Sequence, residues 1–255
     1  MNDIKQDNLV FKIFPSFTHP YISLMRLDRP IGFLLLFYPI SFSLVSQSNY
    51  DYELLKYFIL FFIGSVVMRS AGCVINDILD KKIDKKVKRT QSRPLASSKL
   101  TILKACVTLV ILLLIGLLIL INLNMPSIIL GFLIIPLVIL YPLAKRFFAL
   151  PQLILAMTYN WGCMIGWVAI SSPYNFNNIF ILYLSLVIWT IVYDTIYAVQ
   201  DEEEDRKMNL YSTALLFGSK KLLILNTLII TQYFLLIFFG YKMHYSIIFY
   251  LIVAL

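Results

Sequence analysis

Most of the acidic residues in this chain lie in two short segments, each at the end of a long apolar run. The segments NDILDKKID (76–84) and YDTIYAVQDEEED (193–205) hold three and six of the 14 acids. Carboxylates at a membrane boundary are costly unless they are paired or metal-bound. Acids at a helix C-terminus also oppose the helix dipole, by roughly 0.3–1 kcal/mol per charge. We therefore favour a cation site over the alternative, ordinary solvated helix ends.

Helical spacing of about 100° per residue predicts which side chains of the first segment lie together. One arc of about 100° contains Arg69, Asn76, Asp77, Asp80 and Asp84. A continuous helix would present all of them on a single face.

The same spacing divides the second segment into two groups. Asp194, Asp201 and Asp205 form a stripe with Tyr197 beside it, if the helix continues through the segment. The three glutamates at 202–204 point away from this stripe, and we expect them to be mostly solvated.

The residue types in both segments point to magnesium rather than zinc. Oxygen ligands without paired His or Cys suit Mg²⁺, which usually shares its coordination sphere between carboxylates and substrate phosphates. Cys73, Cys106 and Cys163 lie in apolar segments without metal-type spacing, and we interpret them as packing residues. Two acidic segments with lysines and arginines nearby suggest a magnesium-bridged diphosphate.

Composition identifies the elements that must position these residues. The 255-residue chain is 60% hydrophobic and 14% charged, with mean hydropathy +0.80, which predicts an all-α, polytopic transmembrane helical bundle. Met1–His19 shows no cleavable signal pattern. Apolar runs long enough for roughly 30 Å of hydrocarbon cover about 22–47, 54–78, 102–122, 126–144, 152–171, 178–199 and 221–240, and an eighth begins near Tyr245.

Charge distribution predicts the orientation. With the amino terminus inside, the inner segments carry nearly all of the 22 Lys and Arg residues, as the positive-inside rule requires. This explains the net charge of +8 better than a nucleic-acid partner does. Both acidic segments then end even-numbered spans on the cytoplasmic side, where we expect them to meet at one cavity.

Five motifs in order resemble the UbiA family of intramembrane aromatic prenyltransferases. The two acidic segments, followed by KRTQSRPLAS and STALLFG, resemble the aspartate motifs of that family; LMRLDRPIG (24–32), LYPLAKR (140–146) and PQLILAMTYNWG (151–162) also match. The resemblance covers about residues 20–240, with Ser98 in place of a usual glycine. Members usually have nine spans around a central cavity, so we expect residues 1–255 to be one prenyltransferase domain, truncated within span eight.

The resemblance implies transfer of a polyprenyl group from polyprenyl diphosphate to the ring carbon ortho to the phenol of 4-hydroxybenzoate. This is a membrane step of ubiquinone biosynthesis, placed in the bacterial inner membrane. The implied Mg²⁺ ligands are Asn76, Asp80, Asp84, Asp201 and Asp205. Asp77 and Asp194 are supporting catalytic groups, and Tyr197 lines the allylic cation site unless it is a packing residue.

The implied substrate-binding residues are all cationic. Lys145, Arg93 and Arg206 are candidates for the diphosphate. Arg26, Arg69 and Arg146 are candidates for the benzoate carboxylate. Arg69 lies within a span, where an arginine must face something polar; a structural partner such as Asp80 is the alternative.

Three other functions stay open at this point. Haem O, naphthoate and homogentisate enzymes share the aspartate motifs but prenylate other acceptors. A cation-coupled transporter also keeps acids in the membrane, but near the midplane on broken helices. A scaffold that has lost activity is the third alternative.

Overall fold

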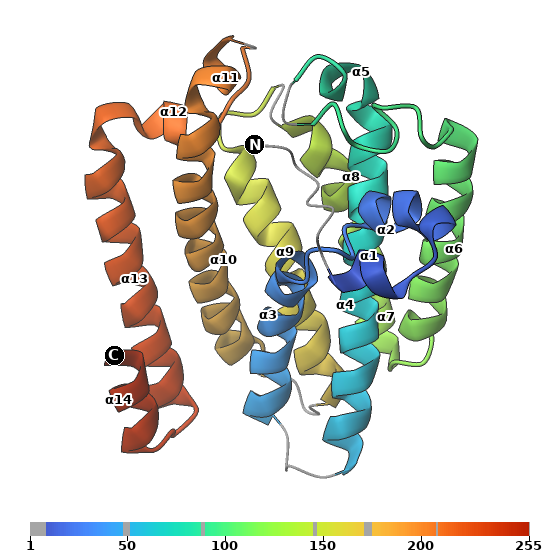
Figure 1. Cartoon of the computed structure of the whole chain (residues 1–255). Coiled ribbons are helices and arrows are strands. Elements are labelled where there is room, and N and C mark those ends of the chain that lie inside the picture. Colours follow the sequence, from blue (N-terminus) through green and yellow to red (C-terminus); the bar gives the residue numbers. More distant parts are fainter. Residues whose placement is uncertain are drawn as a thin grey trace. The chain divides into compact units, whose positions relative to one another are not determined.

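A computed structural model describes residues 9–47, 52–87, 90–144, 147–170, 175–207 and 209–254, and all regular structure within these ranges is helical (Figure 1). The predicted all-α fold is therefore confirmed. The α-helices are α1 (Leu9–Ile13), α2 (His19–Met25), α3 (Ile31–Gln47), α4 (Tyr52–Leu79), α5 (Lys81–Asp84), α6 (Ile102–Leu120), α7 (Met125–Leu133), α8 (Ile135–Ala144), α9 (Pro151–Ile170), α10 (Phe176–Ala198), α11 (Glu202–Lys207), α12 (Thr213–Phe217), α13 (Lys221–Lys242) and α14 (Ile247–Ala254). Short 3₁₀ helices are η1 (Ser16–Thr18), η2 (Val199–Asp201) and η3 (Gly218–Lys220).

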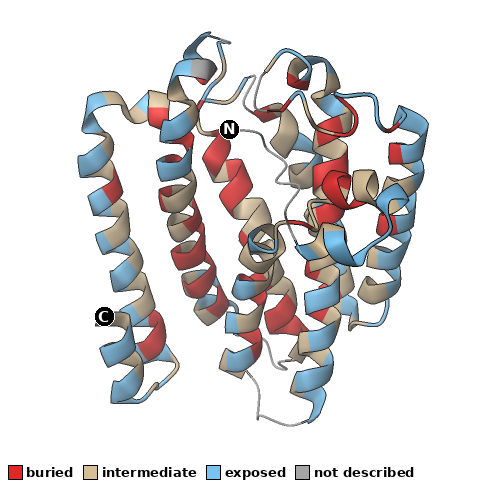
Figure 2. Ribbon diagram, viewed as in Figure 1, coloured by how far each residue is buried: buried red, intermediate tan, exposed pale blue. Residues whose placement is uncertain are grey.

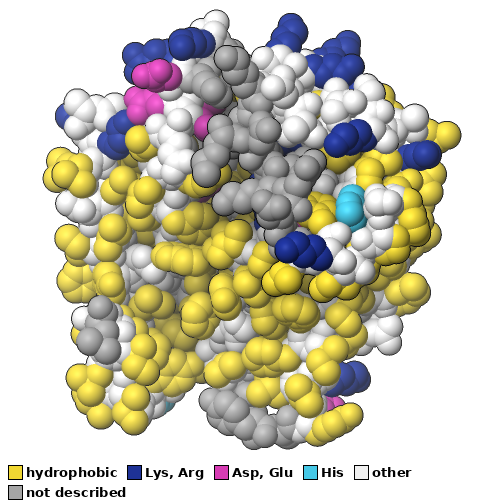
Figure 3. All heavy atoms as spheres, viewed as in Figure 1, with side chains coloured by type: hydrophobic (Ala, Val, Ile, Leu, Met, Phe, Trp, Pro, Cys, Tyr) yellow, Lys and Arg dark blue, Asp and Glu magenta, His cyan; other side chains and the backbone are white. Residues whose placement is uncertain are grey.

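Six helical segments are long and apolar enough to cross a membrane, judged by length and composition within the described residues. They are Tyr52–Leu79, Ile102–Leu120, Met125–Ala144, Pro151–Ile170, Phe176–Asp201 and Thr213–Lys242. Hydrophobic side chains cover most of the visible helix surface, while charged side chains gather near the helix ends (Figure 3). These features identify an integral membrane protein, and the exact number of spans stays a prediction.

The first predicted span, 22–47, is wrong as one continuous helix. Helix α2 ends at Met25 because Arg26 adopts the left-handed conformation, with φ 56°. Pro30 then disfavours helical conformation at Arg29, and α3 begins at Ile31 with 17 residues. The run 126–144 is similarly divided, since α7 ends at Leu133 and α8 begins at Ile135.

The chain forms two compact units. Unit 1 comprises residues 1–37 and 56–123, and unit 2 comprises 38–55 and 124–255. In unit 1, Leu95 and Leu100 from the segment before α6 are buried against Leu24 of α2 and Val74 of α4. This core holds the segment that contains Arg93 close to the end of α4.

Unit 2 is built around α9 and α10, along which buried residues are concentrated (Figure 2). Asn160 of α9 donates a hydrogen bond to the Thr190 hydroxyl of α10 at 2.7 Å. Trp161 donates from Nε1 to the Leu130 carbonyl of α7 at 2.9 Å. Lipid is as apolar as a helix surface, so such polar contacts and close packing must join the helices.

Two glycines of α9 allow close approach of the second half of α3. A Cβ at Gly162 would lie 2.6 Å from Ile40 Cγ1, and one at Gly166 would lie 2.7 Å from Ser43 Oγ. Glycines four residues apart form one groove along a helix, which is how small residues bring membrane helices together.

We expect Gly166→Val to destabilise the protein by about 1–3 kcal/mol, because its side chain would overpack the contact with Ser43 and Ile40. Gly72→Val is the matched control: it has the same helix propensity cost, and no described atom outside its own helix turn lies within 4 Å of a Cβ there. Thermal unfolding of the purified protein in detergent measures both. Equal melting temperatures for the two variants would contradict the packing argument.

Candidate active site

The first acidic segment spans a break between two helices of unit 1. Helix α4 ends at Leu79, Asp80 adopts φ −95° and ψ 6°, and α5 follows as a single turn. The Asp80 amide still donates to the Asn76 carbonyl, and the Asp84 amide to the Asp80 carbonyl, both at 2.8 Å. The helix is therefore interrupted at Asp80, although the helical hydrogen-bond pattern resumes directly after it.

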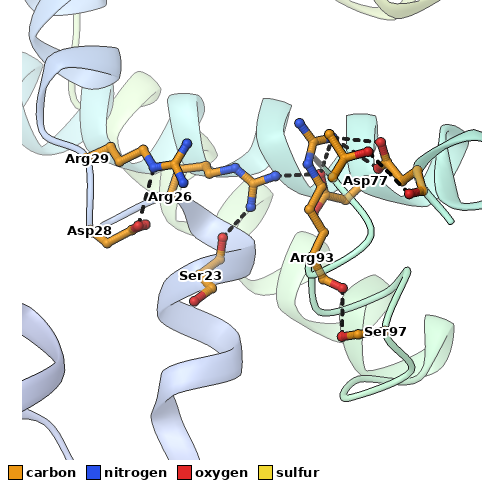
Figure 4. Close-up of polar contacts among 9 residues, drawn as sticks. Ser23, Arg26, Asp28, Arg29, Asp77, Arg93 and Ser97 are labelled. Carbon is orange, nitrogen blue, oxygen red and sulfur yellow. Dashed lines mark hydrogen bonds and ion pairs between the residues drawn. The ribbon is translucent and has the colours of Figure 1, made fainter. Parts of the chain in front are cut away.

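Two arginines converge on Asp77 (Figure 4). Arg26 Nη2 lies 2.9 Å from Asp77 Oδ1, and Arg93 Nη1 lies 3.4 Å from the same oxygen. Arg93 Nη1 also donates to both carboxylate oxygens of Asp84, at 3.2 and 3.0 Å. The predicted proximity of Asp77 and Asp84 is confirmed by this shared arginine.

Burial makes this network energetically important. Asp77 is 1% exposed and Asp84 is 6% exposed. A buried carboxylate without a compensating charge costs several kcal/mol, so each requires the nearby guanidinium groups. Sequence reasoning assigned Arg26 and Arg93 to substrates and did not predict that they hold these two acids.

The backbone positions both arginines. Arg26 directly follows α2 and has a left-handed backbone conformation, and its Nη1 donates to the Ser23 carbonyl. Arg93 is fixed by Ser97, whose hydroxyl donates to the Arg93 carbonyl at 2.8 Å. Ser98, which replaces the usual family glycine, has φ 62°. It therefore keeps the left-handed turn that glycine would adopt more easily.

Asn76 provides a test of whether the segment suits a cation. Its Oδ1 is buried, and no donor among the described residues lies within hydrogen-bonding distance. Within those residues, no three His, Cys, Asp or Glu side chains form a metal site by themselves. An available amide oxygen beside a few carboxylates fits Mg²⁺, which usually takes one or two carboxylates and completes its sphere with water and phosphate.

Arg69 of α4 lies against the first turn of α3. A Cβ at Gly32 would be 2.9 Å from Arg69 Nε, so a larger residue at this position would require the Arg69 side chain to shift. The mid-span arginine is partly buried within unit 1, and its role toward a substrate stays a prediction.

In unit 2, the second acidic segment runs from α10 through η2 into α11. Asp205 is 4% exposed, and Asp194 and Asp201 are half-buried. Tyr197 is 55% exposed and Glu203 is exposed. The roles predicted for the three aspartates and for Tyr197 stay predictions.

Glu202 corrects the expectation of a solvated glutamate. Its carboxylate forms an ion pair with Lys221 at the start of α13, and Arg206 Nη2 lies 3.6 Å from its Oε1. The prediction assumed a continuous α-helix, but each residue of the 3₁₀ helix η2 turns by about 120° instead of 100°. This rotation directs Glu202 differently from the prediction.

Three neutral side chains that sequence reasoning missed join the helices around this segment. The Thr213 amide donates to Gln152 Oε1 at 2.9 Å, and the hydroxyls of Thr213 and Thr195 lie 2.6 Å apart. All three residues are buried. The sequence signal that could have identified two of these residues is the presence of a polar side chain within an apolar motif, PQLILAMTYNWG for Gln152 and STALLFG for Thr213. Lys145 and Arg146 lie outside the described residues.

A family model described as the UbiA prenyltransferase family matches residues 34–255. This chain belongs to the UbiA family. The resemblance seen in its motifs is therefore confirmed.

Curated relatives and a solved structure extend the comparison. The chain is 49% identical to the mitochondrial 4-hydroxybenzoate polyprenyltransferase of Drosophila pseudoobscura pseudoobscura, over 79% of this chain and 51% of that protein. It is 44% identical to the 4-hydroxybenzoate octaprenyltransferase of Francisella tularensis subsp. novicida, over 78% and 70%. A UbiA homologue of Archaeoglobus fulgidus, solved bound to GPP and Mg²⁺, is 18% identical with TM-score 0.73, over 92% and 83%.

This UbiA chain spans about half the length of the mitochondrial relatives that it matches. The structural likeness, at low identity, establishes the helical UbiA fold.

We expect the Arg93–Asp84 ion pair to stabilise unit 1. Arg93→Met leaves two buried carboxylates with less compensating charge and should cost about 3 kcal/mol. Asp84→Asn should cost less in the Arg93→Met background than in the native chain, since the pair is already broken. A double-mutant cycle on the free energy of unfolding in detergent measures this coupling, expected at about 1–3 kcal/mol.

Lys104→Met is the control for loss of one positive charge, because Lys104 is exposed on α6. Strictly additive effects of Arg93→Met and Asp84→Asn would contradict the described ion pair.

Proposed function

We propose that this chain is a magnesium-dependent aromatic prenyltransferase that acts on 4-hydroxybenzoate. It transfers a polyprenyl group from polyprenyl diphosphate to the ring carbon ortho to the phenol. The observation that carries the proposal is the pair of arginines on the carboxylates of the first aspartate motif. The names of the two curated relatives support the choice of acceptor and donor.

The proposed magnesium ligands are oxygen donors from both aspartate motifs. They are Asn76, Asp80, Asp84, Asp201 and Asp205, with Asp77 and Asp194 as supporting groups. Bound Mg²⁺ would supply positive charge that stabilises the departing diphosphate. The buried acceptor oxygen of Asn76 supports this assignment, as does the Mg²⁺ bound to the Archaeoglobus homologue.

Arg93 is proposed to bind the diphosphate while it holds Asp84. A guanidinium has five N–H donors in a rigid fork, so it can contact a carboxylate and a phosphate together. Arg206, whose side chain is 73% exposed, and Lys145 are proposed as further phosphate contacts. These cations favour the charge that develops on the leaving group.

The carbon chemistry requires shielding and orientation from the chain. The allylic C–O bond breaks with its electrons leaving on the diphosphate, and the phenol-activated ring attacks the allylic carbon to form the new C–C bond. The ring proton leaves last, to diphosphate or to a carboxylate. Tyr197 is proposed to face the allylic cation, and Arg26, Arg69 and Arg146 are the candidates for the benzoate carboxylate.

The proposed location is the bacterial inner membrane, with the amino terminus and both aspartate motifs on the cytoplasmic side. The distribution of Lys and Arg supports this orientation. Water-soluble 4-hydroxybenzoate and Mg²⁺ would then reach the motifs from the cytoplasm, while the polyprenyl tail lies among apolar helices.

We expect Asp80→Asn and Asp205→Asn each to lower prenyl transfer by about 10²–10³-fold, because each removes charge that stabilises the leaving diphosphate. Membranes containing the protein are supplied with polyprenyl diphosphate, labelled 4-hydroxybenzoate and Mg²⁺, and lipid-soluble label is measured. Glu203→Gln is the matched control: it removes an exposed acid beside the second motif and should keep activity. Full activity in EDTA, or of Asp80→Asn, would sink the proposal.

We expect 4-hydroxybenzoate to be used in preference to other aromatic acceptors. Homogentisate and dihydroxynaphthoate, supplied at equal concentration, should yield little prenylated product. They also carry a carboxylate and phenols, but only 4-hydroxybenzoate has its carboxylate directly on a single ring and para to the phenol, so a site that holds both groups would place the competing rings differently. Product analysis by mass spectrometry distinguishes the acceptors. Preferred prenylation of either competitor would assign the chain to another branch of the UbiA family.

A further inference from the structure

Unit 1 contains a pocket outside the aspartate motifs that is lined by both apolar and polar side chains. It has a volume of about 460 Å³ and lies between α1, α2 and the segment that contains Arg93. Its polar lining includes Lys12, Ser16, His19, Ser92 and Lys99. No aspartate or glutamate lines it among the described residues.

The chemistry of this lining suits an anion that accepts hydrogen bonds. Lys12 and Lys99 are exposed, so their ammonium groups can turn toward a ligand. Ser92 Oγ is buried and has no hydrogen-bond partner among the described residues. His19 Nε2 lies 2.8 Å from the Phe14 carbonyl, which holds the imidazole in place. Two ammonium groups with an unused hydroxyl match a phosphate group.

The surface around the pocket matches the boundary of a membrane. Leu9, Ile13, Phe14 and Phe17 are 71%, 74%, 50% and 76% exposed. Large apolar side chains at this exposure, with Lys12 beside them, are typical of a segment that lies in the headgroup layer. A pocket bordered by such a segment would lie within reach of lipid headgroups.

We infer that this pocket binds the phosphate group of an anionic phospholipid. The inference does not depend on the proposed function. The pocket is nevertheless connected to the aspartate motif: Ser92 directly precedes Arg93, and Ser23, which also lines it, accepts a hydrogen bond from Arg26. A bound headgroup would therefore contact the segments that position both arginines.

The test measures lipid binding by the full chain purified in detergent. Phosphatidylglycerol and phosphatidylcholine are titrated separately, and bound lipid is counted by native mass spectrometry. We expect phosphatidylglycerol to bind more tightly, and the double variant Lys12→Gln/Lys99→Gln to weaken it about fivefold for each lysine removed. The variant Lys12→Arg/Lys99→Arg should restore binding.

The control Lys56→Gln/Lys104→Gln removes the same charge from two exposed lysines of unit 1 outside the pocket, and it should bind phosphatidylglycerol normally. Equal binding by both glutamine variants would overturn the inference. In a further arm, millimolar inorganic phosphate is added. Complete displacement of phosphatidylglycerol by phosphate would assign the pocket to a free anion and overturn its assignment to a lipid.

Discussion

The compensation of two buried carboxylates governs the arrangement of unit 1. Asp77 and Asp84 are almost inaccessible, and an uncompensated charge at either position would cost a large part of the stability of the protein. The left-handed end of α2 brings Arg26 to Asp77, and the buried Leu95 and Leu100 hold the Arg93 segment against α4. Local backbone geometry therefore positions Arg26, and core packing positions Arg93, in the same ion-pair network.

Unit 2 positions its acids by different means. Hydrogen bonds between uncharged groups connect α9, α10 and α12: the Thr213 main-chain amide donates to the Gln152 side chain, and the hydroxyls of Thr195 and Thr213 pair. Gly162 and Gly166 bring the second half of α3 against α9. Neutral contacts avoid the cost of burying charge, and each is worth only about 1 kcal/mol. The acids of α10 and α11 thus lie next to helices that are joined by uncharged contacts.

Sequence patterns predicted the helices and the aspartate motifs, because long apolar runs and clustered acids are local signals. They could not predict that Arg26 and Arg93 bind Asp77, since 51 and 16 residues separate these pairs in the chain. The division of the first span depends on one left-handed residue, Arg26, which apolarity alone does not reveal. Glu202 was missed because a 3₁₀ turn changes the rotation per residue.

Two carboxylates and two guanidinium groups compensate one another in unit 1, and this affects how the proposed Mg²⁺ and diphosphate would bind. In the network of Asp77, Asp84, Arg26 and Arg93, two negative charges already meet two positive charges. Mg²⁺ binding alone would place a positive charge beside two guanidinium groups. Diphosphate binding alone would place negative charge beside two buried carboxylates. Both arrangements are unfavourable at low dielectric. Entering together, the metal and the diphosphate largely neutralise one another. In the proposed reaction, this four-residue network would therefore favour joint binding of the two, so that cation binding would depend on the presence of a substrate.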